Sequence, residues 1–522
     1  MISPDNNGLY HPKKEHEIID LINFASMNNL QVRVRGAAQS VNRSIYTDGY
    51  NPTAGSPGAN INIQLDQMRS VKFHNNDMQV SVGGGCNLGW DPFDPSGTSK
   101  ENNKNNLLYK LNRKGWGIQN IPDAVHQTIA GYISTGSQGG TMTHSFDDCI
   151  ISIRLIDGNG QVQTFTKSPN PDDPFYAVGV SMGLLGVITS VKLQCVTAFN
   201  IIGQELVTNA DACEFDFFGP GSDVKLSLKD YLATNEFARM LWWPFPTLQR
   251  MISWKAKTMQ LNDYNRQTGS PPHFIPHPYQ PVFPKLFGST LPAEAFAGII
   301  YRLIAKYPQW LYDVLGNTPE LLFIKDKIDT MGPFLYPKLI DMYFPLTSTK
   351  NHLKKFWDYW YGSLPMDTIE FSNNLINLVY TEFWVLADQA ELAVNTLQDY
   401  YQSKGTSKTS YYAVEILGAK SSDFWMSPAY DQQSVRINLL RFDVGTSSNI
   451  NYYQEFWDLF QSKNIPFRLH WGKFLPPASS AIGAGYLGKQ FKKWDDFLTQ
   501  RKQMDPNNIF LNSYWKEQLG IN

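Results

Sequence analysis

The 522-residue sequence has few cysteines, no marked excess of charge and no long apolar run. Its four cysteines lack C-x-x-C spacing and are too few for a disulfide framework in a chain of this length, so we expect a reducing compartment. The formal net charge of −2 and the scattered lysines argue against a nucleic-acid partner. No stretch reaches the ~20 apolar residues of a membrane-spanning helix, and the N-terminus lacks the pattern of a secretory signal. We therefore expect a soluble protein of the cytoplasm.

The length exceeds what one hydrophobic core usually supports, which predicts two packed domains or one domain with a long insertion. The sequence contains 38 glycines, 31 prolines and 14% aromatic residues, a composition typical of a globular protein. Such a composition is compatible with binding an aromatic cofactor.

The first 200 residues alternate short strands with turns. Apolar residues recur at helical spacing over residues 16–29, and residues 30–35 alternate like a strand that runs into Gly36. The turn Asp157-Gly-Asn-Gly160 predicts a β-hairpin. Strands are expected at 61–65, 78–82, 151–155, 162–165 and 187–193.

The segment at about 262–350 differs in composition, since it is rich in proline and aromatic residues. We interpret it as an insertion that covers a site, forms a dimer contact or rests on a lipid surface, and its composition does not choose among these. His273 and His277 have the spacing of a helical metal site, but Pro276 between them defeats the helix, so no metal is expected there. After residue 350 helices and strands alternate again, as at 392–403 and 434–442.

Two glycine-bearing loops are the first candidates for chemistry. Residues 120–140 carry small residues at 130, 131, 134–137, 139 and 140, and residues 36–40 follow a predicted strand. Small residues let main-chain N–H groups approach a ligand closely and can form an anion-binding nest. The two loops could together hold one pyrophosphate, or the glycines could merely turn the chain.

Three motifs in one order extend this interpretation. They are Arg33-Val-Arg-Gly-Ala-Ala-Gln-Ser40, Gln127-Thr-Ile-Ala-Gly-Tyr-Ile-Ser-Thr-Gly136 and Gly183-Leu-Leu-Gly-Val-Ile-Thr189. This order resembles the PCMH-type FAD-binding domain of the vanillyl-alcohol oxidase superfamily. In the second half, Val414-Glu-Ile-Leu417, Arg468-Leu-His-Trp-Gly-Lys473 and Met504-Asp-Pro506 resemble its aldonolactone oxidase and alditol oxidase branch, which includes D-arabinono-1,4-lactone and L-gulonolactone oxidases.

The resemblance implies an α+β fold. It places a two-subdomain PCMH-type FAD-binding domain at 1–200 and an α+β substrate (cap) domain with an antiparallel sheet at 201–480, interrupted by the insertion. A C-terminal segment, 481–522, would return to the FAD domain. The absence of G-x-G-x-x-G after a strand fits this fold better than a Rossmann unit.

The resemblance also implies which residues hold the cofactor, mostly through main-chain groups. The implied FAD-binding residues are Arg35, Gly36, Ala37, Ala38, Gln39, Ser40, Pro122, Thr128, Gly131, Ser134, Thr135, Gly136, Gln138, Gly139, Gly186, Val187 and Ile188.

The implied catalytic residues are Glu415, Lys473 and His470, with Asp123 as a further candidate near the flavin. A carboxylate and a cation can orient a hydroxyl so that its carbon faces flavin N5 for hydride transfer, while a base takes the hydroxyl proton. Without the resemblance, the same residue types would more often form a surface pair or a polar contact in the core.

The sequence departs from this branch at three positions. Gln39 stands where relatives commonly carry the histidine that bonds the flavin covalently, so FAD is expected to be non-covalent. Gln138 replaces a second histidine. Leu417 replaces an arginine that accompanies the glutamate, which leaves Glu415 without its expected partner.

The predicted activity is FAD-dependent oxidation of an alcohol or lactol carbon in a polyol, sugar or aldonolactone. Pro122 stands where oxygen-using members of the superfamily have glycine or proline, which favours an oxidase. The alternatives are a dehydrogenase with another acceptor, a lipid or sterol alcohol as substrate, and a non-catalytic protein that keeps the flavin fold. Gly179-Val-Ser-Met-Gly183 matches a hydrolase nucleophile elbow, but the strand predicted after it reverses the required order.

Overall fold

The computed structural model describes residues 1–52, 59–90, 105–259, 353–365, 378–405, 413–443 and 446–521, together with residue 409 and short pieces between 274 and 347. Most of the predicted insertion at 262–350 lies outside the described residues, and so does His273. The expected roles of the insertion in covering the site, in dimerisation or in lipid contact therefore stay predictions.

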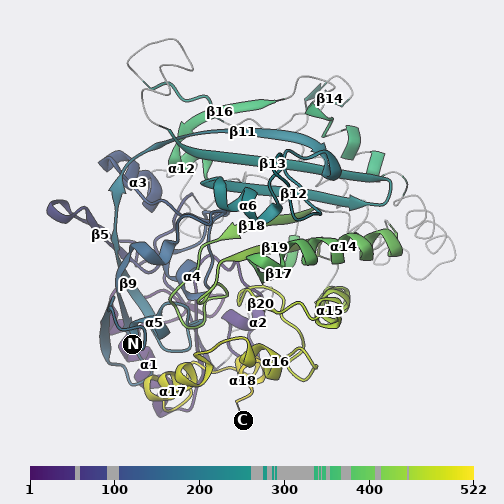
Figure 1. Cartoon of the computed structure of the whole chain (residues 1–522). Coiled ribbons are helices and arrows are strands. Elements are labelled where there is room, and N and C mark those ends of the chain that lie inside the picture. The colour runs from purple at the N-terminus through teal and green to yellow at the C-terminus, as the bar shows by residue number, and fades with distance from the viewer. Residues whose placement is uncertain are drawn as a thin grey trace.

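The first part of the chain contains two small sheets (Figure 1). In the parallel three-stranded sheet, β3 (Ile61–Gln64) lies between β1 (Leu9–Tyr10) and β2 (Val32–Arg35). The antiparallel five-stranded sheet has the order β4-β5-β9-β7-β8, with strands at Val71–His74, Gln79–Gly83, Val187–Gln194, Ile150–Ile156 and Val162–Thr166. The helices in this part are α1 (Glu15–Met27), α2 (Asn42–Ile45), α3 (Leu107–Lys114), α4 (Ile129–Ser134) and α5 (Phe175–Val178).

An eight-stranded antiparallel sheet forms the second part, in the order β16-β11-β13-β12-β18-β19-β17-β20. Its strands are β11 (Asn200–Asn209), β12 (Phe237–Phe245), β13 (Leu248–Met259), β16 (Lys354–Tyr359), β17 (Leu378–Leu386), β18 (Val414–Ala419), β19 (Ser434–Phe442) and β20 (Phe467–Leu469). A short pair, β10 (Val196–Thr197) with β6 (Trp116–Gly117), lies between the two parts, and β14 (Lys285–Leu286) pairs with β15 (Ser289–Thr290).

Helices cover one face of the large sheet, because alternate side chains on its strands are apolar. Trp242 of β12 packs edge-on against Tyr401 of α14 (Ala390–Lys404), at 6.3 Å between ring centroids. The ring centroid of Phe383 on β17 lies 4.5 Å from that of Phe460 on α15 (Thr446–Ser462). The opposite face therefore stays available for polar side chains. Two short helices, α6 (Leu228–Thr234) and α12 (Trp360–Ser363), complete this part.

The C-terminal segment returns to the first part of the chain. Its helices are α16 (Ala484–Lys489), α17 (Trp494–Met504) and α18 (Ser513–Leu519), and Figure 1 shows them in yellow beside the purple N-terminal elements. Val32 N–H donates to the Ile509 carbonyl at 2.7 Å, and Gly158 N–H donates to the Met504 carbonyl at 2.8 Å. The predicted domain boundaries at 200 and 480 stay predictions.

Most predicted elements of the described chain are present. The helix at 16–29 is α1, the strands at 30–35, 61–65 and 78–82 are β2, β3 and β5, and the hairpin is β7–β8. The strand predicted at 187–193 is β9, and the two elements predicted after residue 350 are α14 and β19. Ser181 lies in a loop between α5 and β9, so the order that the nucleophile elbow requires is not met.

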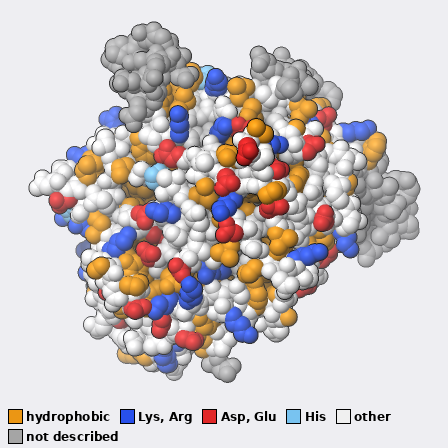
Figure 2. Space-filling view, in the orientation of Figure 1, with side chains coloured by type: hydrophobic (Ala, Val, Ile, Leu, Met, Phe, Trp, Pro, Cys, Tyr) orange, Lys and Arg blue, Asp and Glu red, His pale blue; other side chains and the backbone are white. Residues whose placement is uncertain are grey.

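The described residues contain four free cysteines and no helix that is long and apolar enough to span a membrane. Within the same residues no group of histidine, cysteine or acidic side chains could hold a metal ion. On the face shown in Figure 2, acidic and basic side chains are interspersed, as the near-zero net charge suggests.

Candidate active site

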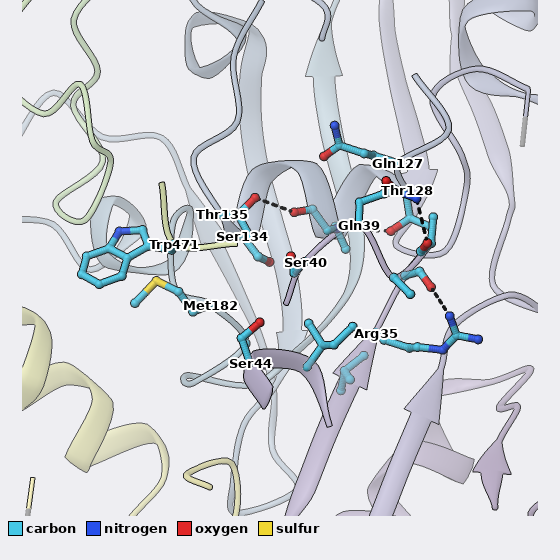
Figure 3. Close-up of a pocket in the computed structure, with 18 of the residues that line it drawn as sticks. Arg35, Gln39, Ser40, Ser44, Gln127, Thr128, Ser134, Thr135, Met182 and Trp471 are labelled. Carbon is cyan, nitrogen blue, oxygen red and sulfur yellow. Dashed lines mark hydrogen bonds between the residues drawn. The ribbon is translucent and has the colours of Figure 1, made fainter. Parts of the chain in front are cut away.

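A pocket lies where the two glycine-bearing loops meet β9 and the segment after β20. Figure 3 shows side chains from both loops around it, including Gln39, Ser40, Thr128 and Thr135, with Met182 and Trp471 toward one end. Its lining consists of Arg33, Val34, Arg35, Gly36, Ala37, Ala38, Gln39, Ser40, Ser44, Ile45, Leu65, Gln127, Thr128, Ala130, Gly131, Ser134, Thr135, Ser137, Met182, Gly183, Gly186, Val187, Ile188, His470, Trp471, Lys473 and Trp515.

The two loops are in direct contact, and glycine permits the contact. A Cβ at Gly36 would stand 2.1 Å from the Thr128 hydroxyl, far inside van der Waals distance. Thr128 also begins α4, where its side chain accepts a hydrogen bond from Gly131 N–H at 3.3 Å. The structure thus brings together two segments that are about 90 residues apart, as the sequence predicts.

Arg33 fixes the floor of the pocket by joining three distant segments. Its guanidinium is buried and donates to the carbonyls of Ser44 at 2.6 Å, Met182 at 2.7 Å and Phe510 at 2.9 Å. Burial lowers its pKa to about 9, which still leaves the side chain charged at neutral pH. The loop after β2, the loop before β9 and the C-terminal segment are therefore held in one arrangement.

The lining suits a dinucleotide with a flat aromatic ring. Small side chains in both loops leave the main chain accessible to a pyrophosphate, and Trp471, Trp515, Val187 and Ile188 offer apolar contact. Gly186 has a φ of +153°, and a Cβ there would lie 2.4 Å from the Ile156 carbonyl. This glycine lets the chain pass close to β7 and then turn along the pocket as β9. The residues present therefore fit FAD.

Lys473 lies where the pocket meets the large sheet. Its ammonium group donates to the Gln39 carbonyl at 3.0 Å and stands 4.4 Å from the centre of the Tyr380 ring. Burial lowers the pKa of Lys473 to about 8, although Glu382 opposes this shift. The side chain is mostly charged at pH 7 and loses its charge within a mildly alkaline range.

His470 has both ring nitrogens engaged. Its Nδ1 accepts from Gly472 N–H at 3.1 Å, so in the neutral ring the proton is on Nε2, which lies 2.8 Å from the Ser137 hydroxyl. Ser137 in turn lies 3.1 Å from the Thr135 hydroxyl. Burial lowers the pKa of His470 to about 4, so the ring is neutral near pH 7. This arrangement favours positioning of the pocket loop over proton abstraction.

Polar side chains cross the large sheet in one row beside Lys473. Glu415 of β18 is the cross-strand partner of Asn438 on β19, and Asn438 is the partner of Glu382 on β17. Asn438 donates to one Glu415 oxygen at 2.7 Å, and its own side-chain oxygen is buried without a protein partner among the described residues. The row therefore offers hydrogen-bonding groups to an oxygen-rich ligand.

Glu382, at the β17 end of this row, forms a buried ion pair with Arg436. Arg436 Nε lies 2.9 Å from the Glu382 carboxylate, and the two side chains are 7% and 1% exposed. Arg436 also donates to the Gln138 carbonyl at 2.5 Å. Burial opposes ionisation of Glu382, but Arg436, helped by His470 and Lys473, outweighs it and lowers the pKa. This pair ties the sheet to the glycine-bearing loop.

Glu415 has a basic partner on another strand, although position 417 carries leucine in place of the arginine of relatives. Arg239 of β12 places its Nε 2.6 Å from the second Glu415 oxygen. Arg239 is the cross-strand partner of Leu417, so the guanidinium comes from the neighbouring strand at the level where the sequence has leucine. The pairing of β12 with β18 joins residues about 180 positions apart, and the sequence pattern did not predict it.

The structure separates the predicted site residues into two groups. Thirteen of the implied cofactor residues line the pocket, and so do His470 and Lys473. Glu415 and Asp123 do not line this pocket. Burial opposes a raised pKa of Arg436, but Glu382, followed by Asp123, outweighs it and raises the pKa. The implied cofactor residues Pro122, Gly136, Gln138 and Gly139 lie outside the lining. The roles assigned to all these residues stay predictions.

The side chain of Gln138 is buried, and neither its amide oxygen nor its nitrogen has a protein partner among the described residues. Both ring nitrogens of His126 are in the same situation, and burial, with Lys473 nearby, lowers the His126 pKa to about 4. Buried polar atoms of this kind usually have a ligand or water partner.

Sequence reasoning missed Arg239, Arg436, Asn438 and Tyr380. A signal was present, because Arg436 and Asn438 alternate with Val435, Ile437 and Leu439 in β19. That period-two pattern indicates a strand with one apolar and one polar face. It does not indicate which strands lie beside it.

Sequence comparisons relate the chain to lactone oxidases. The D-arabinono-1,4-lactone oxidase family matches residues 371–518. L-gulonolactone oxidase of Bos taurus is 22% identical over 515 residues, which cover 97% of this chain and 93% of that protein. D-arabinono-1,4-lactone oxidase of Candida glabrata is 23% identical over 258 residues, which cover 47% of this chain and 40% of the relative's length.

Solved structures show the same fold over nearly the whole chain. A cholesterol oxidase from Brevibacterium sterolicum superposes with a TM-score of 0.69 at 14% identity, covering 98% of this chain and 94% of that one. A solvent-stable cholesterol oxidase superposes with a TM-score of 0.66 at 15% identity, covering 99% and 97%. At this identity the likeness concerns the fold.

Proposed function

Because the chain is similar to lactone oxidases and has the fold of cholesterol oxidases, we propose that it is a member of the vanillyl-alcohol oxidase superfamily and oxidises an alcohol or lactol carbon of an aldonolactone, sugar or polyol. The protein is an FAD-dependent oxidoreductase. The observation that carries the proposal is the junction at Lys473, where the loop pocket meets a row of polar side chains on the large sheet.

When bound, FAD would supply the acceptor for a hydride from the substrate carbon. The loops at 36–40 and 128–137 would hold its pyrophosphate through main-chain groups, and Val187 and Ile188 would lie along it. Gln39 lines the pocket, and its amide cannot form the bond that the histidine of relatives makes to the flavin, which supports a cofactor held without that link.

The chain's own residues bind and orient the substrate. Glu415, with one oxygen held by Asn438 and the other by Arg239, accepts hydrogen bonds from substrate hydroxyls. Lys473 is mostly charged at pH 7 and donates to the oxygen on the reacting carbon. Together they fix which carbon faces the pocket, and the cation stabilises negative charge that develops on that oxygen.

The polar row favours an oxygen-rich substrate over a sterol. Glu415, Asn438 and Lys473 would lose hydrogen bonds against a fused hydrocarbon, and burying such groups unpaired is costly. Oxygen is the proposed acceptor, because the relatives are named oxidases and Pro122 matches the oxygen-using members of the superfamily.

Reduction of the flavin tests the proposal. The purified holoprotein should be yellow, and L-gulonolactone, D-arabinono-1,4-lactone or xylitol should bleach it without air. Admitting air should restore the colour and release peroxide. A coloured protein that no lactone, sugar or polyol bleaches would favour a non-catalytic flavin-fold protein, and bleaching without peroxide would favour a dehydrogenase.

A Glu415→Gln variant sharpens this test. We expect KM to rise by roughly 10- to 100-fold, because a charged acceptor becomes a neutral one. The matched control is Glu391→Gln on the exposed side of α14, which should behave as wild type. Acid denaturation separately tests whether FAD is bound covalently. After the precipitated protein is removed, the FAD should be found in the supernatant.

A further inference from the structure

We infer that Arg239 is a substrate-positioning residue that acts through Glu415. Its guanidinium, supplied by β12, holds the carboxylate in one orientation, so that its remaining lone pairs accept from neighbouring hydroxyls of the substrate. The inference rests on the proposed function and names a residue that no sequence motif of the chain marks.

The sheet register places Arg239 for this role. Arg239 and Leu417 are cross-strand partners on β12 and β18, so their side chains emerge on the same face. Glu415 lies two residues along β18 from Leu417 and shares that face. A long arginine reaches such a diagonal neighbour, and the Nε to carboxylate distance is 2.6 Å.

Two strands hold the Glu415 carboxylate from opposite sides. Arg239 on β12 forms an ion pair with Oε1, and Asn438 on β19 donates a hydrogen bond to Oε2 at 2.7 Å. A carboxylate has about four acceptor positions, and the hydrogen bond from Asn438 occupies one of them, so positions remain on both oxygens. A polyol or lactone with hydroxyls on adjacent carbons supplies two donors at a matching spacing, whereas a single-hydroxyl alcohol supplies one.

The neighbouring pair of Glu382 and Arg436 shows what a purely structural role looks like in this sheet. Its side chains are 1% and 7% exposed, and the arginine also bonds the Gln138 carbonyl. The side chains of Glu415 and Arg239 are 10% and 18% exposed. The first pair is therefore more deeply buried than the second.

Leu417 on β18 lies between Arg239 on β12 and Arg436 on β19, and its apolar side chain separates the two arginines. It is fully buried, and a Cβ on Gly140 would lie 2.8 Å from its Cδ2 atom. Since Leu417 lies directly across from Arg239, the positive charge can be moved between the two strands by exchanging the residues. This exchange provides a rescue experiment that the register alone suggests.

The experiment compares wild type, Arg239→Leu, Arg239→Lys and the exchange variant Arg239→Leu/Leu417→Arg, all as FAD-loaded holoproteins. L-gulonolactone and xylitol serve as probes, with KM, kcat, the anaerobic Kd from the flavin spectrum, FAD content and melting temperature as readouts. Arg113→Leu, at the exposed end of α3, is the matched control.

For Arg239→Leu we expect KM and the anaerobic Kd to rise by roughly 10- to 100-fold, with a much smaller change in kcat and normal FAD content. Arg239→Lys should fall between this variant and wild type, because it keeps the charge but loses the planar donor pair. The exchange variant should recover much of the lost affinity.

Unchanged KM and Kd in folded Arg239→Leu would overturn the inference, and so would an exchange variant that is folded and flavin-loaded but recovers nothing. If Arg239→Leu does not fold, wild-type affinity in Arg239→Lys would overturn it. These outcomes leave the proposed function intact as long as wild type is bleached. A wild-type flavin that no probe bleaches would contradict both the proposed function and this inference.

Discussion

Lys473 joins the two halves of the site through one side chain. Its ammonium group contacts the main chain of the first glycine loop at Gln39 and the ring of Tyr380 on β17. Its pKa of about 8 results mainly from burial, so the charge is lost over a mildly alkaline range. Substrate binding should follow that titration.

We predict that KM for the lactone or polyol rises as pH increases through about 8, because the charged donor is lost above its pKa. Lys473→Met should raise KM by roughly 10- to 100-fold at pH 7 and remove the alkaline dependence. Lys473→Arg should keep its charge above pH 8 and flatten the same limb. Steady-state kinetics from pH 6 to 9 provide the measurement.

The matched control for Lys473→Met is Lys489→Met, which removes an exposed ammonium group at the end of α16. It should reproduce the wild-type pH profile. An alkaline limb that persists in Lys473→Met would assign the titration to another group.

At the scale of elements, the sequence predicts strands better than their neighbours. Alternation identified β19, and the motif at Gly36 to Ser40 correctly indicated a loop that meets the second loop near Thr128. The pairing of β12 with β18 could not be predicted, because a period-two pattern indicates which face of a strand is apolar but not which strand lies beside it. For that reason the sequence indicated only that residue 417 cannot pair with Glu415, and the partner from β12, Arg239, was not predicted.

The contact between the two loops can be tested at Gly36. Gly36→Ala places a Cβ 2.1 Å from the Thr128 hydroxyl, so the loops must separate. We expect FAD occupancy to fall by roughly tenfold or more, since the two loops hold one cofactor and small shifts at such a site are costly. The measurement is the ratio of flavin absorbance to protein absorbance after gel filtration.

Gly485→Ala is the control for this change. Gly485 is exposed in α16, and nothing lies within 4 Å of the added Cβ. The substitution should leave FAD occupancy unchanged and stabilise the helix by about 0.5–1 kcal/mol. Equal FAD loss in both variants would mean that Gly36 has no special role in the pocket.

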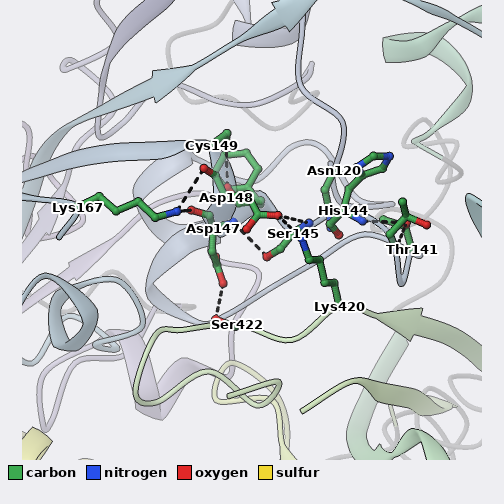
Figure 4. A network of polar contacts seen from close by, with 12 residues as sticks. Asn120, Thr141, His144, Ser145, Asp147, Asp148, Cys149, Lys167, Lys420 and Ser422 are labelled. Carbon is green, nitrogen blue, oxygen red and sulfur yellow. Dashed lines mark hydrogen bonds and ion pairs between the residues drawn. The ribbon is translucent and has the colours of Figure 1, made fainter. Parts of the chain in front are cut away.

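At the scale of the whole molecule, a polar network joins the first part of the chain to the segment that follows β18 of the large sheet (Figure 4). Asp147 and Asp148 lie in a short 3₁₀ helix, η3 (Phe146–Cys149), and face the segment that follows β18. Ser422 donates a hydrogen bond to Asp147, and Lys420 pairs with Asp148 at 2.9 Å. The contact joins η3, which follows the loop of Gln138, to the segment that follows β18, the strand of Glu415. Weakening it should therefore shift the loop relative to that strand.

The network carries a pH dependence that opposes that of the buried histidines. Burial raises the pKa of Asp147 from 3.8 to about 6, so the folded protein holds the extra proton between these values and this contribution to stability falls as pH rises through them. His126 and His470 have their pKa values lowered from 6.5 to about 4, so the unfolded chain holds the extra protons and stability falls as pH decreases through that window. Two histidines outweigh one aspartate, and the holoprotein should melt at a lower temperature at pH 4 than at pH 7.

Asp147→Asn separates these contributions. The amide oxygen can still accept from Ser422, but the variant no longer incurs the cost of an ionised buried carboxylate above pH 6. Its melting temperature relative to wild type should therefore be more favourable at pH 8 than at pH 4, and its own loss of stability toward acid should be steeper than that of wild type. Thermal melts of both holoproteins from pH 4 to pH 8 decide this, because a difference that is constant across the range would show that Asp147 does not titrate there.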